Sequence, residues 1–188
     1  MPDRGKLVVA SILLLALGLA VFAWYWRWQQ GHRAAEVWGP EASRLIRGAR
    51  QTELLLLRPI AEKRNTESPD GEPESQSGPV QTLSISDAEY EVVATFDLAR
   101  SPGLIHARHS LTEDASFVWP PAMDDCAPHW THAMRLSDDD RSAIVAFDFE
   151  CQLVCLVERQ RVMEVVPRIA AGFQRVFERA QTPPQAGP

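Results

Sequence analysis

The cysteines are the first residues in this chain whose type and spacing could support chemistry. There are three of them: Cys126, Cys151 and Cys155. Two strands are expected around a polar turn near Asp139, and their antiparallel register places Cys126 opposite the residues next to Cys151. A disulfide needs Cα atoms about 4.4–6.8 Å apart. The register allows that bond between Cys126 and Cys151, and three buried thiols are the alternative.

The third cysteine does not extend this pattern. Cys155 follows Cys151 by four residues. In a strand these two residues are separated by about 13 Å, too far for a bond. A structural zinc site needs four ligands at tight spacing, and the chain has no Cys-x-x-Cys motif.

Histidines are the second candidates, because imidazole is a common metal ligand. His106 and His109 lie three residues apart on an expected helix and therefore on one face. His129 and His132 follow Cys126, but in an extended segment a spacing of three points them to opposite faces. These four histidines form the candidate metal set. Exposed imidazoles without a metal are the alternative that the spacing favours, and no cofactor is expected.

Other catalytic signatures are missing from the sequence. There is no Gly-x-Ser-x-Gly and no glycine-rich phosphate loop. The paired acids Asp124-Asp125 and the run Asp138–Asp140 lie in expected loops, where they are predicted to be solvated turn residues. The net charge of −6 gives no electrostatic reason to bind nucleic acid or an anionic membrane surface.

The apolar run Leu7–Trp26 determines where the protein is expected to reside. It is uncharged and has the length that an α-helix needs to cross a bilayer. The one tolerable cleavage point, after Ala23, is a poor signal-peptidase site. Aromatic residues cluster at its end, as in an interfacial belt: Trp24, Tyr25, Trp26 and Trp28. The run is therefore predicted to be an uncleaved anchor in contact with membrane lipid.

Flanking charge does not determine the orientation of this anchor. Arg4 and Lys6 precede the run, and Arg27 and Arg33 follow it, so the positive-inside rule favours neither side. The N-terminal signal-anchor position and the cysteine layout favour a domain outside the cytoplasm. We therefore predict a single-pass protein of the inner membrane with a periplasmic domain, and reduced cysteines would support the opposite topology.

The rest of the chain predicts one α+β domain, an antiparallel sheet packed on two or three helices. The expected segments are a tail at 1–6, the transmembrane helix at 7–26, a juxtamembrane linker at 27–39, the domain at 40–181 with a disordered loop at 62–81, and a disordered tail at 182–188. Hydrophobic periodicity predicts helices over about 40–49, 101–113 and from 165 or 166 onward, and strands over 53–58, 90–98, 131–136, 142–149 and 152–158.

A resemblance to a known family rests on three short segments of the chain: Cys126-Ala-Pro128, Ala133-Met-Arg135 and Phe149-Glu-Cys151. In these segments, the chain resembles an uncharacterised family of small bacterial membrane-anchored proteins over about residues 90–157. Asp148 departs from the family pattern, because an earlier cysteine would stand there. The resemblance implies a small α+β domain, often with an N-terminal membrane or export segment, and carries no function.

Two functional hypotheses follow from these observations. The first is an envelope protein with a non-catalytic domain that binds another envelope protein or serves structurally. The second is a membrane-anchored hydrolase or metal-dependent enzyme that uses the region of His106, His109, His129 and His132. A pocket in which at least three of these histidines converge would favour the enzyme.

Overall fold

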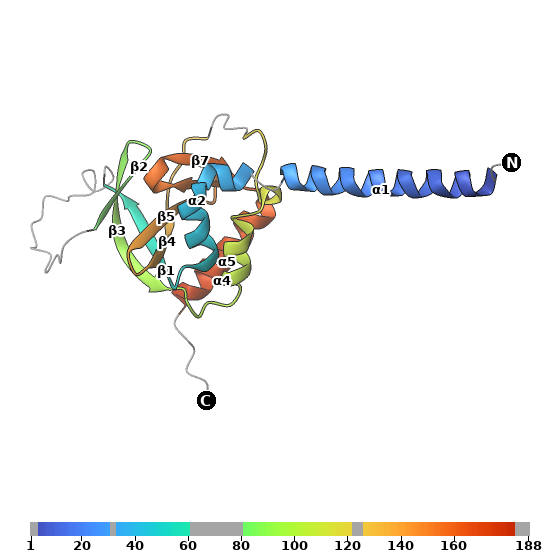
Figure 1. Cartoon of the computed structure of the whole chain (residues 1–188). Helices are drawn as coiled ribbons and strands as arrows, with labels where there is room; N and C mark the ends of the chain where they lie inside the picture. The colour runs from blue at the N-terminus through green and yellow to red at the C-terminus, as the bar shows by residue number, and fades with distance from the viewer. Residues whose placement is uncertain (1–3, 31–32, 61–80, 122–125, 183–188) are drawn as a thin grey trace, which may run out of the picture.

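The computed structural model describes residues 4–30, 33–60, 81–121 and 126–182. Most of the expected loop at 62–81 and of the expected tail at 182–188 lies outside the described residues. The fold is α+β, with a curled antiparallel sheet of seven strands and four described helices (Figure 1). The helices are α1 (Arg4–Gln30), α2 (Arg33–Gly48), α4 (Leu104–Ser110) and α5 (Pro167–Gln181), with short 3-10 turns η1 (Asp114–Ser116) and η2 (Val157–Arg159).

The sheet has the strand order β2-β3-β1-β4-β5-β6-β7, with every pair antiparallel. Its strands are β1 (Gln51–Pro59), β2 (Thr82–Ile85), β3 (Ala88–Asp97), β4 (His132–Asp138), β5 (Arg141–Asp148), β6 (Leu153–Leu156) and β7 (Arg161–Glu164). The leucine run in β1 is explained by its position between β3 and β4, where Leu54 and Leu55 are buried on opposite faces.

All five expected strands are present, and β4 and β5 pair around a turn at Asp139, as expected, from His132 with Phe147 to Asp138 with Arg141. Two further strands, β2 and β7, are not indicated by the sequence. The β2–β3 turn uses Ser86 and Asp87 at positive φ (49° and 66°), without the Asn-Gly or Asp-Gly pair that usually marks such a turn. The strand β7 spans only Arg161–Glu164 and shows little hydrophobic alternation.

The helix α1 is long and apolar enough to cross a membrane over Val8–Trp26, a test that signal sequences also pass. The helix α1 runs to Gln30 and α2 begins at Arg33, so the juxtamembrane linker expected at 27–39 is helical in all of its described residues. Gly39 interrupts α2 at a positive φ of 76°, which glycine adopts without steric cost. The helix predicted from Pro40 is therefore the second half of α2.

Side chains from other elements hold both ends of α2. At its start, the Asp114 carboxylate accepts hydrogen bonds from the backbone N–H groups of Arg33 (3.2 Å) and Ala34 (2.8 Å). This replaces the capping side chain that a helix start usually takes from its own sequence. Because Asp114 belongs to η1, the chain just after α4 is fastened to the chain just after α1.

At the end of α2, the Arg108 guanidinium of α4 binds three backbone oxygens. It donates to Leu45 (2.9 Å), Ile46 (2.7 Å) and Ala49 (3.1 Å). Leu45 and Ile46 are in the last turn of α2 and Ala49 follows it. Carbonyl groups at a helix end lack partners within the helix, although the Leu45 oxygen also accepts the N–H of Ala49 (2.8 Å). Burial lowers the pKa of Arg108, yet arginine keeps its charge in proteins and remains a fork of donors.

The replacement Arg108→Lys is expected to lower the free energy of unfolding by about 2 kcal/mol, because an ammonium group cannot reach three carbonyl groups in this arrangement. Urea denaturation would measure the change. Arg50→Lys is the matched control and should change stability by less than about 0.5 kcal/mol. Equal losses in the two variants would show that Arg108 is not a cap.

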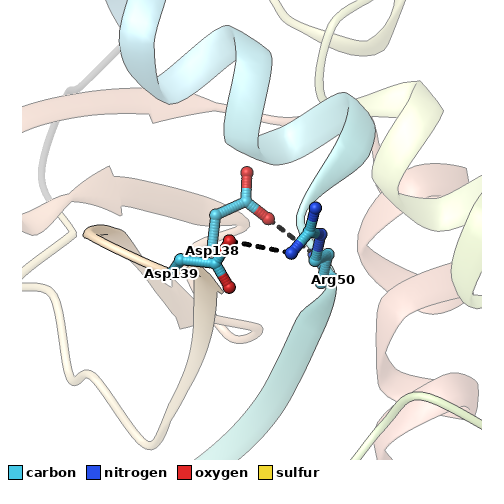
Figure 2. Close-up of polar contacts among 3 residues, drawn as sticks. All are labelled: Arg50, Asp138 and Asp139. Atoms are coloured by element: carbon cyan, nitrogen blue, oxygen red, sulfur yellow. Dashed lines mark hydrogen bonds and ion pairs between the residues drawn. The ribbon is translucent and has the colours of Figure 1, made fainter.

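The control residue fastens the start of β1 to the turn between β4 and β5 (Figure 2). The backbone N–H of Arg50 donates to Asp138 (2.9 Å), and its guanidinium pairs with Asp139 (2.8 Å). Both side chains of the ion pair are more than 70% exposed, at 73% and 77%, so solvent screens it. Two of the acids expected to be solvated turn residues, Asp138 and Asp139, therefore also bind Arg50.

Two apolar clusters lie on opposite faces of the sheet. The first combines one face with buried side chains of α2, α4 and α5, and it contains Trp38, Phe147, Phe173 and Phe177. The second fills the inside of the curl and contains Leu55, Tyr90, Trp130 and Cys155. The amphipathic face expected for α5 lies in the first cluster.

Candidate functional site

A disulfide joins the segment before β4 to the turn after β5. The Cα atoms of Cys126 and Cys151 are 5.9 Å apart, within the range that the bond requires. The sulfur atoms are bonded even though β4 and β5 stop pairing at His132 and Phe147. The disulfide therefore closes the open end of this hairpin.

The carboxylate of Asp148 organises the chain around that disulfide. It accepts hydrogen bonds from the backbone N–H groups of His129 (2.8 Å), Glu150 (2.9 Å) and Cys151 (3.1 Å), and its residue is only 2% exposed. One buried acid thus fixes both chain segments that the disulfide connects. Asp148 therefore has a structural role at this turn.

The third cysteine, Cys155, is buried in the second apolar cluster, the one that contains Leu55 and Tyr90. Cys155 is a fully buried free thiol. Burial raises its pKa to about 11. Since the thiolate is the reactive form, this side chain is unsuited to nucleophilic or redox chemistry in the folded protein.

The histidines that follow Cys126 have separate environments. His129 is exposed, and its backbone rather than its ring binds Asp148. The ring of His132 is stacked on Phe177 with centroids 5.8 Å apart, and its Nδ1 lies 2.8 Å from the Thr131 hydroxyl. Burial lowers the pKa of His132. It is therefore a half-buried aromatic side chain under α5.

The histidines of α4 are also apart from these two. His109 pairs with Glu113 of the same segment (Nδ1–Oε1 3.0 Å), and His106 lines a groove beside α5. In the parts of the chain that the structure describes, no group of three or more His, Cys, Asp or Glu side chains could hold a metal ion.

The groove beside His106 is the first of two basic hollows that the sequence did not reveal. This α4–α5 groove has a volume of about 280 Å³. Its floor is apolar, with Phe173 and Val176, and its α5 side carries Arg168, Arg175 and Arg179. No acidic side chain is among its described lining residues. The arginines are found at spacings of seven and eleven residues, which a helix places in one row.

The second hollow lies between α2 and η2 and is larger, about 800 Å³. Three arginines line this α2–η2 hollow, together with one acid, Glu36: they are Arg44 and Arg47 of α2 and Arg159 of η2. The guanidinium of Arg159 lies where a Cβ on Gly39 would be, but this flexible group could move aside, so the positive φ of 76° is what favours glycine there. Elements that are remote in sequence create both hollows, and no local motif marks them.

Of the aromatic residues predicted to form an interfacial belt, Trp24, Tyr25 and Trp26 are exposed. The side chain of Trp28 lies outside the described part. Comparison with protein-family models, with curated proteins and with solved structures found no match to the chain.

Proposed function

We propose that this chain is a single-pass inner-membrane protein whose periplasmic domain acts by binding an envelope partner rather than by catalysis. The observation that carries the proposal is the Cys126–Cys151 disulfide in a chain that begins with the apolar helix α1. Disulfides persist in the periplasm and are rare in the cytosol. A periplasmic domain would keep the Cys126–Cys151 bond oxidised, while Cys155 stays a free thiol because it is buried.

The separation of the histidines supports binding over catalysis. His106 and His109 are on α4, and the ring of His132 is stacked on Phe177 of α5. His129 lies in the segment that precedes β4. The enzyme hypothesis needs at least three of them in one pocket. The described hollows instead present arginines, which suit recognition of anionic groups.

Counting free thiols in the full-length protein tests this location. The protein would be made in a bacterial host, trapped with an alkylating agent under denaturing conditions, and analysed by mass spectrometry before and after reduction. We expect one alkylated cysteine before reduction, Cys155, and three afterwards, since burial keeps Cys155 out of the bond. The variant Cys155→Ser should show none before reduction.

A C-terminal reporter adds an independent measurement of topology. Alkaline phosphatase, which is active only outside the cytoplasm, should be active when fused after residue 188, and a cytoplasm-dependent fluorescent reporter should be dark. Three alkylated cysteines before reduction, together with a bright cytoplasmic reporter, would overturn the proposal.

A further inference from the structure

The arginines of the α4–α5 groove have no acidic partner among the described residues. No ion pair of the described chain includes Arg168, Arg175 or Arg179, although the whole protein has a net charge of −6. Glu178, which is on the same helix, does not line the groove. A row of three cations around a hollow therefore stands out from an acidic surface and attracts anions.

A hydrogen bond links the segment that follows α4, one wall of the groove, to the segment that follows α1. The η1 carboxylate of Asp114, four residues after the end of α4, binds the N–H of Ala34, four residues after the end of α1. Four extended residues span at most about 14 Å. The end of α4 is thereby held near the point where the chain leaves α1, and α5 lies beside α4 (Figure 1).

Apolar side chains adjoin the arginines in the same groove. Pro102 and half-buried Ile169 line it together with Phe173 and Val176. Arginines beside apolar side chains match the interface of an anionic bilayer, where phosphates and the first acyl carbons lie together.

We propose that the α4–α5 groove faces the bilayer and binds the phosphate headgroups of anionic phospholipids. This proposal rests on the proposed role of α1 as a membrane anchor. The tether keeps the groove at the surface, and repulsion of the acidic remainder orients the domain with its basic face toward the lipid. The overall charge argued against such contact, but the local distribution of charge favours it.

The test uses the full chain in lipid nanodiscs with a polarity-sensitive fluorophore on His106→Cys, a position that is exposed and lines the groove. The native cysteines do not compete for the label, because two are bonded and the third is buried. We expect a blue-shifted emission in discs that contain phosphatidylglycerol, and no shift in discs of phosphatidylcholine alone. A label on Asp87→Cys, in the β2–β3 turn, should show no shift in either.

Charge variants show which hollow is responsible. The triple variant Arg168→Gln/Arg175→Gln/Arg179→Gln should lower the docked-to-undocked ratio about five-fold for each arginine removed. The matched variant Arg44→Gln/Arg47→Gln/Arg159→Gln in the α2–η2 hollow should leave the ratio unchanged.

Three results would overturn the inference. The first is no shift at position 106, and the second is equal loss in the two triple variants. The third is loss of the shift on adding inorganic phosphate at constant ionic strength, which would assign the groove to free phosphate. Recovery of the chain outside the discs would contradict the anchor itself, and with it the proposed function.

Discussion

Replacing Asp148 with alanine is expected to lower the free energy of unfolding by about 3–5 kcal/mol, and the change would be measured by urea denaturation. The carboxylate accepts three backbone hydrogen bonds at 2.8–3.1 Å from two chain segments. Its removal leaves the N–H groups of His129, Glu150 and Cys151 without their acceptor in a poorly solvated site. Bonds to a charged acceptor are stronger than neutral ones, so the loss exceeds that of an ordinary turn residue.

Two further variants show whether the effect of Asp148 comes from accepting hydrogen bonds and from its buried position. Asp148→Asn keeps one carbonyl oxygen but turns the other acceptor into a donor. We therefore expect its free energy of unfolding to lie between those of the wild type and Asp148→Ala. Asp138→Ala removes a carboxylate that accepts one backbone N–H, from Arg50, near the surface, and should lose about 1 kcal/mol. Equal losses at Asp138 and Asp148 would contradict the special role of the buried acid.

Removing the disulfide with Cys126→Ala/Cys151→Ala is expected to cost about 3.5 kcal/mol, on the chain-entropy estimate for the 25-residue separation of the two cysteines. The cross-link restricts the unfolded chain and closes the end of the β4–β5 hairpin. Urea denaturation would measure the loss, and the denaturant dependence should steepen because the unfolded chain expands further.

Reduced wild-type protein provides the control for the double variant. It should match Cys126→Ala/Cys151→Ala within about 0.5 kcal/mol, since both lack the same cross-link. The loss should not add fully to that of Asp148→Ala, because Asp148 and the disulfide hold the same turn at Cys151. Strict additivity would mean that the two act independently.

The parts of the fold that were predictable are those with strong local patterns. The alternation in 142–149 and the amphipathic face of α5 indicated β5 and the last helix, and the cysteine register followed from one turn. The strands β2 and β7 were not predictable, because each has four residues and a weak hydrophobic pattern. The strand β6 is equally short, but all four of its residues are apolar and buried. The start of α2 at Arg33 depends on Asp114, 80 residues from Ala34, which no local pattern can indicate.

The candidate sites show the same division. Cys126 and Cys151 were found from the sequence because a hairpin register links positions near one turn. The row of Arg168, Arg175 and Arg179 could have been recognised on the polar face of α5, but its groove exists only where α4 packs beside it. Charge averaged over the chain hid this row, because electrostatics at a surface depends on distribution rather than on the sum.

The side chain of Gln160 has a further consequence for β2, the strand at one end of the sheet. Its amide accepts from the N–H of Ser86 (2.6 Å) and donates to the carbonyl of Ser84 (3.2 Å), much as the backbone of another strand would. An open strand edge can recruit strands from other molecules and start aggregation. With Gln160 in place, the edge of β2 is partly occupied from within the chain, which protects the protein against edge-to-edge polymerisation.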